Sequence, residues 1–146
     1  HPYETVAYEI TTLENSRSDL GMGCIGELPR SMQESDFLKK LKDILSTPAF
    51  RHSALLGKGI KRVAILGGSG SFAIESATAQ GADAYITADL KYHDFFRAEG
   101  SCLLVDVGHY ESEQFTKTTI MKHLNENFPN FAFISSKTDT NPVHYF

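Results

Sequence analysis

Two side chains that can bind a metal ion, His109 and Glu113, lie four residues apart after an apolar stretch. Residues 102–105 (CLLV) are typical of a buried strand that ends at Asp106. Gly108 then turns the chain into a helix that we expect to begin near His109. Positions i and i+4 share one face of a helix, so the imidazole and the carboxylate would be neighbours. Such a pair at the carboxyl end of a buried strand can supply half of a divalent-metal site, although the spacing alone also suits a plain first helical turn whose dipole favours a glutamate.

A second polar cluster follows the preceding apolar strand, which we place at residues 84–86. It contains Asp89 and His93, together with Lys91 and Asp94. The carboxyl ends of neighbouring parallel strands meet at one edge of a sheet. We therefore expect this cluster to converge with Asp106, His109 and Glu113. The competing interpretation of His93 is a capping or surface histidine.

A glycine-rich turn, GGSGS at residues 67–71, follows another apolar strand. Gly68, Gly70 and Ala73 fit a loose dinucleotide-binding fingerprint, and Asp89 lies about 20 residues downstream, where a ribose-binding acid would stand. The turn is not in the first βα unit, however, and too little chain remains for a two-half nucleotide fold. No lysine follows the glycines, which excludes a P-loop. Close packing of a helix onto the sheet explains the same residues, and backbone amides near an anionic group are a further alternative.

The elements that must position these clusters alternate along the chain. From residue 49 their order is β-β-α-β-α-β-α-β, which predicts an α/β fold with a mostly parallel sheet flanked by helices. We expect strands at 49–56, 63–66, 84–86, 102–105 and 131–134, and helices at 72–80, 90–98 and 109–127. The long last helix should turn its apolar residues, among them Ile120 and Phe128, inward.

The sequence pattern of residues 1–48 predicts two further strands and a helix. Residues 1–13 alternate between apolar and polar side chains, as in a half-buried strand. Residues 21–30 read as a short glycine-interrupted strand closed by Pro29. Ser31 and Glu34 form a capping-box pattern that would start a helix, and Pro48 would end it.

Composition restricts the classes of function. The 146 residues suit one domain, and the net charge of −4 argues against a nucleic-acid partner, which needs a basic surface. Cys24 and Cys102 are too few for a disulfide scaffold, and each lies in an apolar run, so we expect buried free thiols and a cytoplasmic protein. No apolar run approaches the roughly 20 residues of a membrane span, so we expect no membrane partner. The absence of an initiating Met suggests a processed or excised piece.

Five segments, HPYETVAYEI, GCIGELP, AILGGSGSF, GADAYITADLKYHDF and VDVGHYESE, resemble the C-terminal portion of the NIF3-like proteins in order and spacing. This family is also called DUF34 or the GTP cyclohydrolase 1 type 2 homologs. The resemblance runs nearly the length of the chain. It implies that residues 1–13 are the last strand of an inserted PII-like module and that 14–146 are the C-terminal half of a NIF3-like α/β domain.

The resemblance also implies a two-metal site formed from both halves of a longer chain. The family motif G-H-x-x-x-E maps onto His109 and Glu113 as metal ligands. The early half of the family brings a His-His pair and an Asp, and this sequence has no adjacent histidines. The resemblance therefore implies two divalent ions (Zn, Mn or Fe) per intact protein and an incomplete site in this chain.

The function implied is that of a dinuclear-metal-dependent hydrolase acting on a nucleotide or purine derivative. His93 would be a nearby acid/base or substrate contact, and Asp89 and Asp106 would be substrate-facing or second-shell carboxylates. The alternative is a metal-binding regulatory or protein-interaction module without catalysis. The resemblance further implies a homo-oligomer in the intact protein and a small nucleotide-like ligand.

Overall fold

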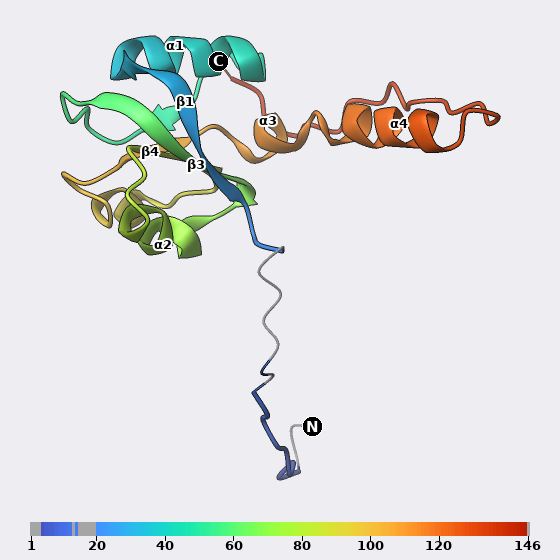
Figure 1. Ribbon diagram of the computed structural model, residues 1–146, viewed down its shortest axis with the longest axis horizontal. Helices are drawn as coiled ribbons and strands as arrows, with labels where there is room; N and C mark the ends of the chain where they lie inside the picture. The colour runs from blue at the N-terminus through green and yellow to red at the C-terminus, as the bar shows by residue number, and fades with distance from the viewer. Residues whose placement is uncertain (1–3, 13, 15–19, 146) are drawn as a thin grey trace.

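A five-stranded mixed sheet organises the computed structural model, which describes residues 4–12, 14 and 20–145 (Figure 1). The strands are β1 (Cys24–Gln33), β2 (Arg51–His52), β3 (Gly59–Ser69), β4 (Ala84–Ala88) and β5 (Leu103–Asp106), in the order β1-β3-β4-β5-β2. The central strands β3, β4 and β5 are parallel, whereas β1 and β2 run antiparallel at the two edges. The predicted α/β class is confirmed, but the sheet is parallel only at its centre.

Helices cover both faces of this sheet (Figure 1). The helical elements of the described residues are α1 (Glu34–Leu45), the 3-10 turn η1 (Ser71–Ala73) with α2 (Ile74–Ala79), the 3-10 helix η2 (Tyr92–Phe96), α3 (His109–Glu113) and α4 (Thr116–Asn127). The helix α1 lies over one face of the sheet and α2 over the other, while α4 extends away from the sheet. Within the described residues, no helix has the length and apolar character that crossing a membrane requires.

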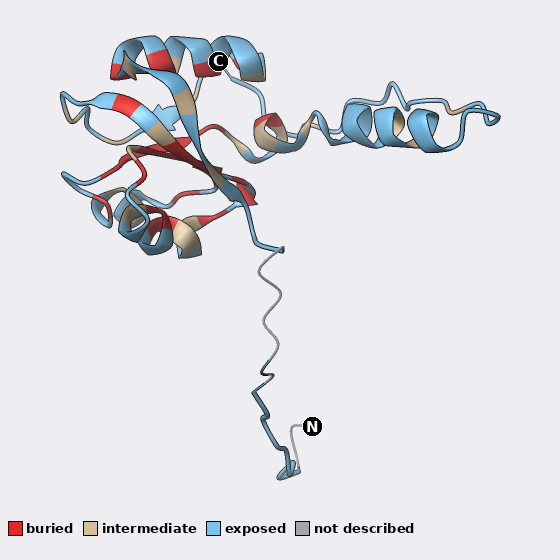
Figure 2. Cartoon of the chain, viewed as in Figure 1, coloured by how far each residue is buried: buried red, intermediate tan, exposed pale blue. Residues whose placement is uncertain are grey.

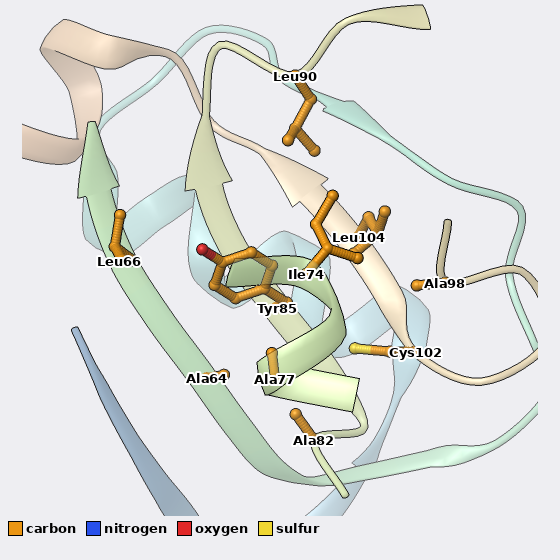
Figure 3. Close-up of a cluster of buried hydrophobic side chains, with 10 residues drawn as sticks. All are labelled: Ala64, Leu66, Ile74, Ala77, Ala82, Tyr85, Leu90, Ala98, Cys102 and Leu104. Carbon is orange, nitrogen blue, oxygen red and sulfur yellow. The ribbon is translucent and has the colours of Figure 1, made fainter. Parts of the chain in front are cut away.

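The core lies on the two sides of the parallel strands, where Figure 2 shows most of the buried residues. Along β4 and β5 the side chains alternate, so Tyr85 and Leu104 join the cluster on the α2 side (Figure 3). Ile86 and Val105 join the cluster on the α1 side. Because each fully buried aliphatic side chain contributes about 1.5–3 kcal/mol, a strand covered on both faces favours a continuous apolar run. The apolar runs of β4 and β5 therefore predict these two strands from the sequence.

The start of α1 differs from the predicted capping box. Ser31 lies inside β1, which continues past Pro29 with a shift in its register against β3. Glu34 is the first residue of the helix and is buried. Its carboxylate accepts hydrogen bonds from the backbone amides of Leu56 and Gly57, each at 2.8 Å. The glutamate therefore fixes a loop distant in sequence rather than capping its own helix.

Three other predicted elements are shorter than expected. The helix expected at 90–98 is the five-residue 3-10 helix η2. The strand expected at 49–56 is only the two-residue β2, which pairs with β5. The helix expected at 109–127 is interrupted between α3 and α4. At the interruption the side-chain amide of Gln114 donates to the carbonyl of Leu45, 2.8 Å away. A contact with the end of α1 therefore accompanies the break.

Several predicted apolar elements are exposed in the described part of the chain. Cys102 is buried as expected, but Cys24 is exposed at the start of the edge strand β1. Residues 131–134 form no strand within the described residues, and residues 4–12 of the predicted first strand are exposed and unassigned to any strand, the rest of that strand lying outside the described residues. Ile120 and Phe128 are 53% and 51% exposed, so the apolar side of α4 does not pack inward (Figure 2). A half-buried strand or helix needs a neighbour to cover its apolar face, and the described residues do not supply one.

Replacing Glu34 with Ala should lower the free energy of unfolding by about 2–4 kcal/mol, because two backbone amides would lose their acceptor. Urea denaturation followed by circular dichroism measures this change. Asp36→Ala on the exposed side of the same helix is the matched control and should change stability by less than about 0.5 kcal/mol. Equal effects of the two substitutions would contradict the role assigned to Glu34.

Candidate functional site

Asp89 and His109 meet at the carboxyl edge of the parallel strands. Asp89 directly follows β4, and His109 begins α3 after β5. The Asp89 Oδ2 and His109 Nδ1 atoms are 2.6 Å apart. The two polar clusters expected to share this edge are therefore joined by a direct hydrogen bond between an imidazole and a carboxylate.

Glu113 lies on the same face of α3 as His109. The His109 Nε2 and Glu113 Oε2 atoms are 3.4 Å apart, and both side chains are about half exposed. Since Asp89 occupies Nδ1 of the imidazole, Nε2 is the ring nitrogen that faces Glu113. We call Asp89, His109 and Glu113 the histidine cluster.

The backbone at Asp89 adopts a left-handed conformation, with φ of 57°. Residues other than glycine rarely adopt this region, although aspartate does so more readily than most. Strained backbone of this kind persists only where the surroundings fix it, and it concentrates at functional sites. Here the conformation accompanies the direct contact between Asp89 and His109.

Gly68 of β3 lies against the other two members of the cluster. Its φ is +67°, and a Cβ atom on it would lie 2.7 Å from Glu113 Oε1 and 3.4 Å from His109 Nε2. Its amide donates to Ser112 Oγ at 2.8 Å, and that hydroxyl donates to the His109 carbonyl at 2.8 Å. Gly68 is therefore required for a close approach of the turn to α3. This observation favours the packing interpretation of the glycine-rich turn over a dinucleotide site.

Asp106 lies beneath the cluster and is buried, with 4% of its side chain exposed. Its carboxylate accepts hydrogen bonds from the amides of Leu90, at 3.0 Å, and Gly108, at 3.1 Å. It also pairs with the guanidinium of Arg51. Asp106 therefore supports the backbone of the site through three partners. Arg51 was missed by the sequence analysis, because a single arginine in a predicted strand carries no signal of such a contact.

His93 is not brought into the cluster. It lies in η2 and is exposed, with its ring edge-on to that of Tyr92 at a centroid distance of 5.1 Å. It does not line the groove that contains His109 and Glu113.

A groove of about 1020 Å³ adjoins the histidine cluster. Its lining includes the cluster itself, Arg51, Asp106, Tyr110, Glu111, Lys117, and residues of the segment 136–145, among them Asn141 and Tyr145. In that segment Asp139 lies beside Tyr110, and Tyr145 lies beside the buried Glu111. The groove is large enough for a small-molecule ligand.

The hydrogen bond to Asp89 raises the pKa of His109, and the negative charges of Asp89 and Glu113 raise it further. These contacts stabilise the protonated imidazole. Their contribution to folding is therefore present while His109 is protonated, and it is lost as the pH rises through the raised pKa.

The histidine cluster fits only part of a metal shell. No group of three His, Cys, Asp or Glu side chains able to hold a metal ion occurs among the residues that the structure describes. His109 Nε2 and the Glu113 carboxylate face the same space, and the absent Cβ of Gly68 leaves that space open. Two ligand atoms are thus available, and any further ligands must come from elsewhere.

Replacing Asp89 with Asn should lower the pKa of His109, because the neutral amide no longer favours the imidazolium. Titration of the His109 ring protons by NMR in metal-free protein measures this pKa. Glu113→Gln is the matched comparison and should lower the pKa less, since the bond to Asp89 is the larger contribution. An unchanged pKa in the Asp89 variant would contradict the hydrogen bond.

Comparisons with known proteins place this geometry in a family. The family model described as Duf34/NIF3 (NGG1p interacting factor 3) matches residues 4–142. The GTP cyclohydrolase 1 type 2 homologs of Bacillus subtilis and Staphylococcus aureus are 36% and 33% identical to the chain, over 99% of its length and 40% of their own.

The crystal structure of a Bacillus cereus protein related to NIF3 aligns with the whole chain and with 41% of its own length, at 32% identity and a TM-score of 0.75. The chain thus spans about 40% of the length of the curated relatives it matches. The match over nearly all of its residues shows that the chain belongs to the Duf34/NIF3 family.

Proposed function

We propose that the chain supplies two protein ligands to a divalent-metal site, His109 through Nε2 and Glu113 through its carboxylate. Asp89 orients the imidazole through Nδ1. The observation that carries this proposal is the geometry of the histidine cluster, in which Nδ1 is occupied at 2.6 Å and Nε2 faces a carboxylate at 3.4 Å. Metal-binding histidines almost always donate their second ring N–H to a carboxylate, a carbonyl or water, which fixes the tautomer and strengthens the ligand.

The spacing of the two ligand atoms supports binding of one ion between them. Zinc–nitrogen and zinc–oxygen bonds of about 2.0–2.2 Å place two tetrahedral ligands roughly 3.3 Å apart. The Nε2 and Oε2 atoms already stand at 3.4 Å. A histidine and a carboxylate suit Zn, Mn or Fe, so the ligand types do not select among these metals.

The remaining ligands of the proposed site come from outside the described residues. Two protein ligands leave an ion exposed to water, so this chain alone should bind metal weakly. The relatives are more than twice as long as this chain, which supports a site completed by additional polypeptide. Following the family resemblance, we propose two ions in the completed site.

The reaction that we propose for the completed site is metal-dependent hydrolysis of a nucleotide or purine derivative. A divalent ion supplies Lewis acidity and lowers the pKa of a bound water. The relatives' name, GTP cyclohydrolase 1 type 2 homolog, and the groove beside the cluster support this class of reaction. His109 and Glu113 hold the ion, Asp89 fixes the imidazole, and the groove receives the substrate. His93 lies outside the groove, so its suggested acid/base role has no support from its position.

A regulatory or protein-interaction function without catalysis is the second candidate. Exposed apolar side chains on α4 and after it favour this candidate, among them Ile120, Phe128 and Phe131. Such residues are typical of surfaces that another polypeptide covers. We propose that they contact additional chain or another copy in a homo-oligomer.

His109→Ala and Glu113→Ala should each weaken Zn²⁺ or Mn²⁺ binding by this chain at least roughly tenfold, because each removes one of two ligands. Equilibrium dialysis with metal analysis by mass spectrometry measures the binding. His123→Ala is the matched control, since His123 is exposed on α4 and, among the described residues, its ring nitrogen Nδ1 has the Asn127 side chain as its hydrogen-bond partner. Unchanged binding in the His109 variant would overturn the ligand assignment. Gly68→Ala should also weaken binding, because its Cβ would enter the ligand space.

Catalysis can be tested in a chimera in which this chain replaces the matched segment of the Bacillus subtilis relative. We expect metal-dependent conversion of at least one member of a panel of purine nucleotides, lost on His109→Ala. Product analysis by chromatography with Zn²⁺, Mn²⁺ and Fe²⁺ measures turnover, and the intact relative is the control for folding. If the relative turns over a nucleotide and a folded, metal-loaded chimera does not, the catalytic proposal for this chain fails and the regulatory function is favoured.

A further inference from the structure

Arg51 is held in place on the wall of the groove. The short strand β2 pairs Arg51 with Asp106 of β5. The Nη2 atom of Arg51 donates one hydrogen bond to the carbonyl of Leu90, at 2.8 Å, and another to the carboxylate of Asp106. The guanidinium lies over the ring of Phe95, with Cζ 5.6 Å from the ring centroid. Three contacts therefore fix one edge and one face of the guanidinium before any ligand binds.

The rest of this guanidinium is free to bind a ligand. Arginine carries five N–H donors in a rigid fork, and the described contacts of Arg51 use only those on Nη2. No partner for Nε or Nη1 occurs within the described residues. The side chain is 60% exposed and lines the groove that also contains His109 and Glu113.

The carboxylate that Arg51 contacts, Asp106, also accepts hydrogen bonds from backbone amides. Asp106 accepts from the Leu90 and Gly108 amides. Glu111, which also lines the groove, is buried beside Tyr145. Among the residues that the structure describes, the Nε and Nη1 donors of Arg51 have no protein acceptor. A second cation, Lys117, lines the same groove, and within the described part of the chain its hydrogen-bond acceptor is the carbonyl of Ser136, 3.3 Å away.

We propose that Arg51 is an anion-binding residue of the groove, which receives the phosphate or carboxylate of a small molecule. An arginine fork binds such groups through two parallel hydrogen bonds, and a preordered fork loses little conformational entropy on binding. Anion binding by Arg51 rests on the proposed function in one respect: the ligand bound by Arg51 is the one that reaches the histidine cluster. Binding of an anion to Arg51 itself needs no metal.

The test is a titration of metal-free protein with pyrophosphate and, separately, with succinate, two probes for the two anionic groups. The ¹⁵N–¹H resonance of Arg51 Nε, assigned by its absence in Arg51→Gln, reports binding directly in the wild-type protein. We expect this resonance to shift saturably with at least one probe. A shift with pyrophosphate alone assigns a phosphate ligand, and a shift with succinate alone assigns a carboxylate. No shift with either probe overturns the proposal.

Variants separate Arg51 from general charge effects. Arg51→Gln should weaken binding of the active probe at least roughly tenfold, and Arg51→Lys should weaken it less, because the lysine keeps the charge and loses the fork. Arg30→Gln, on exposed β1, is the matched control and should bind like the wild type. Equal affinity of the Arg51→Gln and wild-type proteins would overturn the proposal.

His109→Ala distinguishes this proposal from the metal-site proposal. Anion binding should persist in His109→Ala, since Arg51 is held by Asp106, Leu90 and Phe95 rather than by the histidine. Loss of anion binding in that variant would contradict an independent role of Arg51. If the protein binds no metal but the Arg51 resonance still shifts, the metal site is rejected and the anion site is supported.

Discussion

The site depends on one buried charge, the carboxylate of Asp106. An ionised carboxylate removed from water costs several kcal/mol unless hydrogen bonds and an opposite charge replace its hydration. Asp106 obtains them from the amides of Leu90 and Gly108 and from Arg51. These partners belong to the loop after β4, the turn before α3, and β2. Satisfying one charge therefore fixes the segments that carry Asp89, His109 and the arginine of the groove wall.

The sequence predicted the central part of this arrangement because simple rules determine it. Strands covered on both faces have continuous apolar runs, which revealed β4 and β5. The carboxyl ends of parallel strands share an edge, which predicted that Asp89 would approach His109 although the two are 20 residues apart. The i, i+4 spacing placed Glu113 beside His109 on α3. None of these inferences required knowledge of the edge strands, which proved antiparallel.

The features that the sequence did not predict depend on contacts between distant residues. The Ser31 capping box failed because β1 pairing continues through that serine and because the Glu34 carboxylate accepts from a loop more than twenty residues away. The break after α3 accompanies a contact of Gln114 with the end of α1. Arg51 has no motif around it, and only the folded chain shows its three partners. Local patterns cannot reveal residues whose roles are set by a distant acceptor.

The two ends of the groove differ in the chemistry that remains available. At the histidine cluster, Nε2 of His109 and the Glu113 carboxylate can accept a cation, since the cluster's third member already binds Nδ1. At the wall formed by β2, Asp106 accepts from backbone amides, whereas Nε and Nη1 of Arg51 have no partner among the described residues. By holding the anionic group of a small molecule, Arg51 would restrict the position of that molecule relative to His109 and Glu113. Such restriction of a bound reactant is a large source of rate enhancement. Under the anion-binding proposal, the pair of Arg51 and Asp106 would serve both the fold and ligand binding.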